Sequence, residues 1–275
     1  MKKKKDLFSI FLRGIVYLAA ALTFFSLIFI VGYILIQGVP NLKPSLFTWT
    51  YTSENVSLMP ALINTILMVL LALIIALPLG VITAIYLVEY AGSKNKIVGW
   101  IRLTTETLSG IPSIIYGLFG MLFFVVFLGW GLSLISGAAT LSIMILPLIM
   151  RTAEEALKSV PDSYREASYG LGAGRLRTIF KIVLPSAMQG IIAGVILGIG
   201  RIVGETAALI YTAGAIAKIP NSIFSSTRTL SVHMYLLSSE GFNTNEAFAT
   251  AVVLLGIVLL LNTTSTLIAK KVNKK

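Results

Sequence analysis

Residues 107–150 decide the fold, and they read TLSGIPSIIYGLFGMLFFVVFLGWGLSLISGAATLSIMILPLIM. None of these 44 residues carries a charge. A helix crosses the roughly 30 Å hydrocarbon core of a bilayer with about 20 residues, so this run is long enough for two passes. Uncharged runs of 23 and 34 residues precede it, at residues 14–36 and 55–88. The sequence therefore predicts an all-α, polytopic membrane protein.

Six membrane spans are expected within one transmembrane domain that comprises residues 1–275. We place them at about residues 12–37, 59–86, 111–128, 132–150, 189–211 and 247–269. The long run divides near Gly129, Trp130 and Gly131. The first apolar run follows a lysine-rich start and extends well beyond the about 7–15 apolar residues of a secretory signal peptide, so it is interpreted as a retained span.

The overall composition agrees with this assignment. Hydrophobic residues make up 56% of the chain and charged residues only 12%, about half of the charged fraction usual in a soluble domain. The chain has no cysteine, which excludes disulfides, thiol catalysis and metal sites built on cysteine. The net charge of +11 is carried at the chain ends and in two loops beside apolar spans, so we expect no binding of nucleic acid.

Lysine and arginine residues indicate the orientation. Eighteen of them fall at the two chain ends and in the segments 94–102 and 151–181, whereas Lys43, Lys218 and Arg228 are the three on the opposite side. Cytoplasmic loops carry the excess of basic residues, so both termini are predicted to face the cytoplasm. Segments 38–58 and 212–246 then face outward, either as solvated connections or as a docking surface for an external partner.

The cytoplasmic segment 151–186 carries a specific spacing of small and apolar residues. Its fixed positions are Glu166, Ala167, Ser168, Gly172, Ile182, Leu184 and Pro185. The spacing resembles the coupling loop of ATP-binding-cassette importer permeases, which reads Glu-Ala-Ala, three residues, Gly, nine residues, Ile-x-Leu-Pro. Ser168 in place of the second alanine is the one departure. The resemblance implies a type I importer fold of the MetI-like kind, coupled to a separate ATPase through this loop.

The residue types explain how such a loop works. Pro161 and Asp162 suit the first turn of a helix, where proline is tolerated and an acidic group meets the positive end of the helix dipole. Small side chains at 167, 168 and 173 allow close approach of another protein, and Gly172 permits a sharp turn. We expect a short helix that lies along the membrane surface and seats in a groove of a soluble partner. An ordinary amphipathic connector is the alternative.

Arg201 and Glu205 interrupt the fifth predicted span. Ionised groups near the middle of a bilayer cost several kcal/mol unless they are paired or face water. Their i, i+4 spacing would place both on one helix face. They form either a buried ion pair that locks two helices or, as we favour, a polar patch that lines a translocation path with Thr206. The planar fork of arginine matches phosphate or carboxylate oxygens, and Glu205 can accept a hydrogen bond from a protonated oxyanion.

Two stretches resemble the membrane subunits of phosphate importers. One is Arg201 followed by Gly-Glu-Thr-Ala at 204–207, and the other is SGIPSIIYGLF at 109–119. The similarity extends from the second predicted span to Leu261 and is greatest to PstA-type permeases, in which a proline is expected at the position of Ala208. The resemblance implies inorganic phosphate import across a bacterial or archaeal plasma membrane. It also implies a homologous second permease in a heterodimer, an ATPase dimer and an external phosphate-binding protein as partners.

Other functions fit the sequence less well. A molybdate or sulfate permease would share the cytoplasmic loop but not the two stretches above. An ion-coupled secondary transporter would use Arg201 and Glu205 in coupling, yet one intramembrane acid is few and inverted repeats are not apparent. A membrane enzyme would need a cluster of histidines and carboxylates or a nucleophile–base pair, which the sequence does not offer.

The remaining polar residues support no cofactor site. The sequence has no G-x-x-x-x-G-K-[ST] motif, so ATP and magnesium are expected on the partner ATPase, and this chain is predicted to be a transport subunit rather than an enzyme. His233 is the only histidine and has no supporting ligands for a metal. Asn64 and Thr65 either line the path or satisfy contacts between helices.

Overall fold

The structure, a computed structural model, describes residues 7–91 and 96–272. The lysine-rich start and Lys94, which contributed to the predicted orientation, lie outside the described residues. Every regular element in the described ranges is a helix, which confirms the predicted all-α class. The α-helices are α1 (Leu7–Gly38), α2 (Met59–Ile85), α3 (Lys96–Ser109), α4 (Ser113–Gly120), α5 (Leu134–Lys158), α6 (Asp162–Gly170), α7 (Arg175–Thr178), α8 (Leu184–Val203), α9 (Ala207–Thr212), α10 (Leu230–Glu240) and α11 (Thr244–Val272). Short 3-10 turns occur at Val39–Asn41 and Pro44–Phe47, and π-helical turns at Tyr86–Tyr90, Met121–Phe127 and Ile179–Val183.

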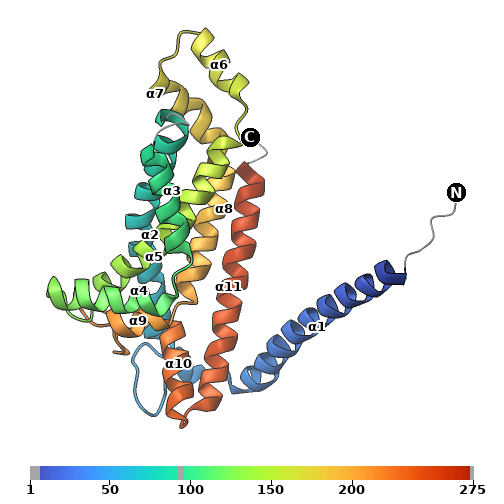
Figure 1. Cartoon of the computed structure of the whole chain (residues 1–275). Coiled ribbons are helices and arrows are strands. Elements are labelled where there is room, and N and C mark those ends of the chain that lie inside the picture. The colour runs from blue at the N-terminus through green and yellow to red at the C-terminus, as the bar shows by residue number, and fades with distance from the viewer. Residues whose placement is uncertain (1–6, 92–95, 273–275) are drawn as a thin grey trace.

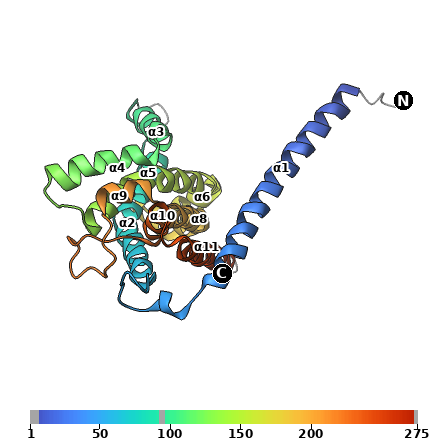
Figure 2. The same cartoon turned by 90° about the horizontal axis from the view of Figure 1, so that it is seen from below.

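Helix α5 lies at the centre of the bundle. It packs against α2 and α8, and α11 packs against α8 (Figures 1 and 2). In the most apolar stretch of α5, 72% of the residues are buried, compared with 28% in α2. The helix α5 is therefore surrounded by protein, whereas α2 keeps an apolar face free for lipid or for another subunit.

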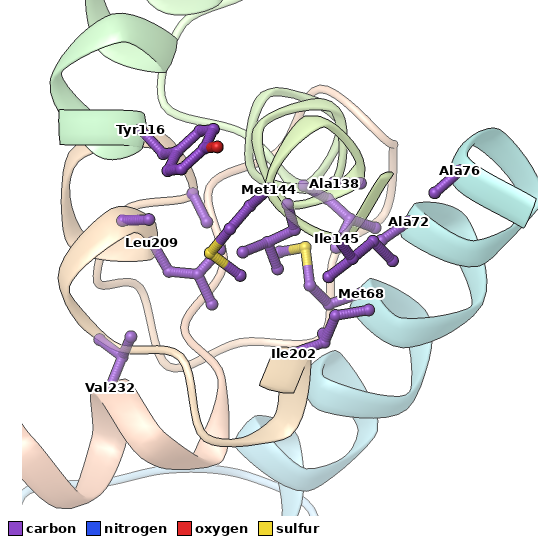
Figure 3. Close-up of a cluster of buried hydrophobic side chains, with 14 of the residues drawn as sticks. Met68, Ala72, Ala76, Tyr116, Ala138, Met144, Ile145, Ile202, Leu209 and Val232 are labelled. Carbon is purple, nitrogen blue, oxygen red and sulfur yellow. The ribbon is translucent and has the colours of Figure 1, made fainter. Parts of the chain in front are cut away.

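The core between these helices is built from small and flexible side chains. Met68, Ala72 and Ala76 follow one another at four-residue intervals, so they share one face of α2. They meet Met144 and Ile145 of α5, and the ends of α8 and α9 close the cluster (Figure 3). Small side chains let membrane helices approach closely, which is how packing stabilises a bundle that gains little from excluding water.

The third predicted span, at 111–128, is found as one helical segment from Ser113 to Phe127, but this segment does not run straight on from the helix before it. It meets α3 at an angle of 103°. Gly110 and Pro112 lie at the break, and a residue before proline is restricted to extended conformations. The apolar run therefore does not divide into two straight spans, because its first half turns across the bundle beside α9 (Figure 1).

The fifth predicted span begins earlier and ends earlier than residues 189–211. A helical run starts at Arg175, passes through the π-turn Ile179–Val183, and continues as α8 to Val203. Leu184 and Pro185 therefore lie inside this run instead of ending the cytoplasmic loop. Proline has no N–H for the helical ladder, and the π-turn immediately before Pro185 accommodates that loss. The chain leaves the helix at Gly204 and resumes as α9.

Helix α1 diverges from the bundle, whereas the other terminal helix belongs to it. The first turns of α11 hold the end of α1, where Tyr33 and Phe248 pack edge to face with ring centroids 5.6 Å apart. The rest of α1 projects away from the other helices (Figures 1 and 2). Five helical segments in the described residues are long and apolar enough to cross a membrane, or six if α3 and α4 form one bent span.

The contact between α4 and α9 predicts a stability effect. A Cβ atom added at Gly117 would lie 2.8 Å from the Cα atom of Ala208, which is main chain and has little freedom to move. Gly117→Ala should therefore lower the free energy of unfolding by about 1–3 kcal/mol, as expected for overpacking. Thermal unfolding of the purified permease measures this. Gly256→Ala is the matched control, because no atom lies within 4 Å of its added Cβ. Equal stability of both variants would contradict the packing argument.

Candidate functional site

Helix α6 has the boundaries that its sequence predicts. Pro161 precedes it with a ψ of 140°, and Asp162 occupies its first turn. Gly172 adopts a φ of +79°, a left-handed conformation that glycine reaches without strain. The N–H of Ala173 donates to the carbonyl of Ser168 at 3.1 Å and closes the end of the helix. A short, well-defined helix therefore lies between α5 and α7 at one end of the bundle (Figure 1).

A hollow of about 550 Å³ separates α6 from the start of the next helical run. Its lining residues are Tyr164, Ala167, Ser168, Leu171, Gly172, Ala173, Arg177, Lys181 and Ile182. At its base the hydroxyls of Ser168 and Thr178 form a buried hydrogen bond of 2.8 Å. Leu171 at the rim is 90% exposed, and Glu166 and Ala167 are also exposed. Of the predicted coupling residues, Ala167, Ser168, Gly172 and Ile182 thus line the hollow, Glu166 is exposed on α6, and Leu184 and Pro185 lie in the next helical run.

An ion pair that the sequence did not reveal attaches α6 to the end of α2. Arg165 donates to Glu89 Oε1 through Nε at 3.0 Å and through Nη2 at 2.7 Å. The two side chains are only 13% and 5% exposed. Arg165 also donates to the carbonyls of Val160 and Leu157, at 2.8 and 3.0 Å. The guanidinium of Arg165 therefore links α6, the end of α5 and the last turn of the α2 segment in one network.

A second arginine strengthens this connection. Arg175 donates to the main-chain carbonyl of Glu89, and its guanidinium lies 4.6 Å from the ring centroid of Tyr90. An arginine above an aromatic face is attracted by the ring quadrupole. The start of the fifth helical run is thereby tied to the same turn as α6.

Arg201 and Glu205 do not form the helical pair that their spacing suggested. Arg201 lies in the last turn of α8, and the helix ends at Val203, so the i, i+4 geometry is interrupted before Glu205. No ion pair joins the two within the described residues. Glu205 is 9% exposed, and its Oε1 accepts a hydrogen bond of 3.1 Å from the N–H of Ala208. The carboxylate therefore caps α9, which leaves the guanidinium of Arg201 available to other groups.

Alanine at position 208, where PstA-type permeases are expected to have proline, makes this hydrogen bond possible. A proline has no N–H and could not donate to Glu205. With alanine, the carboxylate satisfies one of the free N–H groups at the start of α9. Thr206 lies within the break and its carbonyl accepts from Ile210 at 3.2 Å. Arg201 lies near Tyr116 of α4 and acts on it electrostatically. The break thus brings Arg201, Glu205 and Thr206 to one place beside α4.

Comparisons with known proteins agree with this architecture. Residues 76–275 match the family model described as the binding-protein-dependent transport system inner membrane component. The chain belongs to that family. A probable ABC transporter permease protein, YqgI of Bacillus subtilis (strain 168), is 34% identical over 280 residues, which is 95% of each chain. The phosphate transport system permease protein PstA 1 of Mycobacterium tuberculosis is 35% identical over 211 residues, which cover 76% of this chain and 69% of that protein.

Solved structures support the fold independently. The chain resembles the MetNI methionine ABC transporter in an inward-facing conformation, with a TM-score of 0.60 over 88% of this chain and 97% of the other, at 20% identity. The predicted MetI-like architecture and the PstA-type resemblance are both confirmed. The protein is a multi-pass component of the plasma membrane, and its relatives are transport permeases.

The Glu89–Arg165 pair predicts an unequal response to two similar substitutions. Glu89→Gln removes the buried carboxylate partner of Arg165 and leaves only the exposed Asp162, so it should lower the free energy of unfolding by about 3 kcal/mol. Glu155→Gln removes an exposed partner of Arg151 and should change stability by less than about 0.5 kcal/mol. Denaturant unfolding of the two purified variants compares them. A loss of equal size in both would show that the buried pair has no special role.

Proposed function

We propose that this chain is one permease subunit of an ATP-driven importer of inorganic phosphate and that it forms half of the translocation path. The observation that carries the proposal is the 35% identity to a phosphate permease over more than two thirds of that protein. The remaining parts would be a homologous second permease, a dimer of ATPase subunits that binds ATP and magnesium, and an external phosphate-binding protein. The described fold supplies the membrane component.

The cytoplasmic end supports coupling to an ATPase. Helix α6 lies at the end of the bundle with Leu171 exposed, which suits insertion of the helix into a groove of a soluble subunit, and the hollow beside it can receive a side chain of that subunit. When ATP binding moves that groove, α6 moves with it. Because Arg165 joins α6 to the end of α2, the movement reaches the helices of the path. ATP and the external protein would favour different states, which is the condition for alternating access.

The helix break supports passage of an oxyanion. Arg201 carries a guanidinium that no carboxylate neutralises within the described residues, and its planar donor fork suits phosphate oxygens. Glu205 is held as the cap of α9 and supplies negative charge nearby. An anion is then attracted to Arg201 without being held so tightly that its release is slow.

The substrate is tested with reconstituted complexes. Proteoliposomes that contain both permeases and the ATPase, supplied with the binding protein, should take up labelled phosphate only when ATP is present. Excess sulfate or molybdate should leave the rate unchanged. Uptake of sulfate or molybdate in preference to phosphate would contradict the proposed substrate, and uptake without the ATPase subunit would favour a secondary transporter.

The role of Arg201 is tested by Arg201→Gln. The variant should assemble normally and reduce the phosphate uptake rate by roughly ten-fold or more, because a charge-assisted hydrogen bond to the anion is lost. Arg13→Gln removes an exposed arginine of α1 and serves as the control. Normal uptake by an assembled Arg201→Gln complex would exclude Arg201 from the path.

The hollow beside α6 predicts a separate effect on assembly. Ala167→Trp places a large side chain in the hollow and should weaken association with the ATPase by roughly ten-fold or more, since a docking surface loses its complementarity. Ala167→Ser nearly preserves the volume and should bind normally. Co-purification with titrated ATPase measures both. Equal association of the two variants would place the ATPase elsewhere.

A further inference from the structure

A charged hollow of about 200 Å³ lies between α3 and the cytoplasmic end of α5. It is lined by three basic residues, Arg102, Arg151 and Lys158, and by three acidic ones, Glu106, Glu154 and Glu155. Met150 also lines it and is the last residue of the uncharged run at 107–150, whereas Arg151 is the first charged residue after that run. The hollow therefore lies where α5 leaves the hydrocarbon region and meets the lipid headgroups of the cytoplasmic leaflet.

The positive charges in this hollow exceed what their partner can neutralise. Glu154 Oε1 lies 2.7 Å from Arg102 Nη2 and 2.6 Å from Lys158 Nζ, so two cations share one carboxylate. The side chain of Glu154 is only 9% exposed, whereas those of Arg102 and Lys158 are 44% and 50% exposed. Arg151 and Glu155 pair with each other at 3.4 Å. Arg102 and Lys158 therefore carry one positive charge in excess, and both can offer it to a ligand.

Glu106 supplies the opposite charge. It follows Arg102 by four residues on α3, a spacing at which the two side chains could pair along the helix. Arg102 turns instead to Glu154, and no basic side chain pairs with Glu106 within residues 7–91 and 96–272. An ionised carboxylate at the border of the hydrocarbon region is costly unless it meets water or a cation. The hollow thus presents an excess positive charge and an unpaired negative charge one helical turn apart.

An apolar groove of about 380 Å³ adjoins the charged hollow. Thr105 and Met150 line both, so the hollow and the groove share a wall. The groove lies between α3, α5 and the end of α2, and Ile101, Leu108 and Leu146 are among the residues that line it. Helix α3 lies at the edge of the bundle (Figure 2), so the described part of the chain leaves this groove open to the bilayer. An acyl chain is the apolar group that a bilayer offers to such a groove.

Exposed aromatic side chains mark the headgroup level beside the groove. Trp100 lines the groove and is 69% exposed, and Tyr86 and Tyr90 at the end of α2 are each 43% exposed. Tryptophan and tyrosine concentrate at membrane–water interfaces, where the ring has apolar contacts and its polar group meets water or headgroups. A charged hollow, an adjoining apolar groove and interfacial aromatic residues are together the parts of a site for one phospholipid.

The two charges of the hollow select the headgroup. Phosphatidylethanolamine carries a phosphate and a primary ammonium, which a short ethylene linker joins. The phosphate of this lipid suits Arg102 and Lys158, and the ammonium can donate hydrogen bonds to the carboxylate of Glu106. We propose that the hollow between α3 and α5 binds the headgroup of phosphatidylethanolamine in the cytoplasmic leaflet, with an acyl chain of the same lipid in the adjoining groove.

Two other common headgroups match these charges less well. Phosphatidylglycerol is anionic and brings no cation to Glu106, so this carboxylate would stay unpaired beside a second negative charge. Phosphatidylcholine carries a quaternary ammonium, which has no N–H to donate to a carboxylate. The hollow therefore favours a zwitterionic lipid with a primary ammonium over both.

Quenching of Trp100 fluorescence by brominated lipids tests the site. The assembled complex of both permeases and the ATPase is placed in phosphatidylcholine nanodiscs, into which brominated phosphatidylethanolamine, phosphatidylglycerol or phosphatidylcholine is titrated. The signal from the groove is the part of the quenching that Trp100→Phe abolishes. Brominated phosphatidylethanolamine should quench at a roughly ten-fold lower fraction of the lipid than the other two, because it alone bonds to Glu106. Equal quenching by all three lipids would overturn the site, and so would no quenching, which is expected if another subunit covers α3.

Glu106→Gln isolates the contribution of the carboxylate. The substitution keeps the size of the side chain and breaks no ion pair within the described residues, so the fold should be unaffected. The preference for phosphatidylethanolamine over phosphatidylcholine should disappear. Glu54→Gln removes an exposed carboxylate at the outward end, and this matched control should keep the preference. A full preference in Glu106→Gln would show that the ammonium binds elsewhere, and the assignment of the headgroup would be wrong.

Lys158→Gln tests the other half of the headgroup site. Glu154 keeps Arg102 as its partner in this variant, but the excess positive charge that faces the phosphate of the lipid is lost. Binding of brominated phosphatidylethanolamine should weaken by roughly ten-fold, because a charge-assisted contact is removed. Unchanged binding would overturn the site. The measurement requires neither ATP nor anion uptake, so its outcome is separate from that of the substrate assay.

Discussion

Main-chain hydrogen bonds within a bilayer must be satisfied by the protein itself, and this constraint determines where the helices of this chain can break. The interruption between α8 and α9 exposes free N–H groups at the start of α9. Glu205 satisfies one of them through its carboxylate, and Ser231 satisfies the carbonyl of Glu205 from α10. The break is therefore stabilised by two side-chain hydrogen bonds, and one of them holds the carboxylate of Glu205 at its border.

The same constraint explains which parts of the structure could be predicted from the sequence. Charge-free runs of more than 20 residues have few outcomes other than membrane helices, and the turn after α6 requires a residue such as Gly172. The bend at Pro112 and the early start of the fifth run at Arg175 were missed. Hydrophobicity indicates which residues can lie in lipid, but it does not indicate the direction in which a helix runs. The expectation that Arg201 and Glu205 lie on one helix face was wrong because it assumed a continuous helix, whereas α8 ends at Val203.

The contacts that sequence reasoning missed join distant parts of the chain. Asn64 and Arg228 lie 164 residues apart in the sequence, and Glu89 and Arg165 lie 76 apart. No periodicity or local spacing carries such pairings. Glu89 directly follows the uncharged run at 55–88, and only the position of α6 shows that it is a buried partner. An acidic residue at a span boundary, opposite a basic residue in a coupling loop, is the signal that could have suggested it.

Arg165 and Arg228 are both largely buried, but different groups compensate their charges. Arg165 has two carboxylates, of Glu89 and Asp162, and two main-chain carbonyls within hydrogen-bond distance, so its donors are used and its position is fixed. A fully hydrogen-bonded ion pair of this kind fixes the position of α6 against the end of α2 more than it adds net stability. The cost of desolvating both charges offsets much of their attraction. Arg228 has only the face of Tyr51. The attraction between the guanidinium and the ring quadrupole of Tyr51 offsets part of the cost of burying Arg228, so this cation is held by an aromatic face where Arg165 is held by carboxylates.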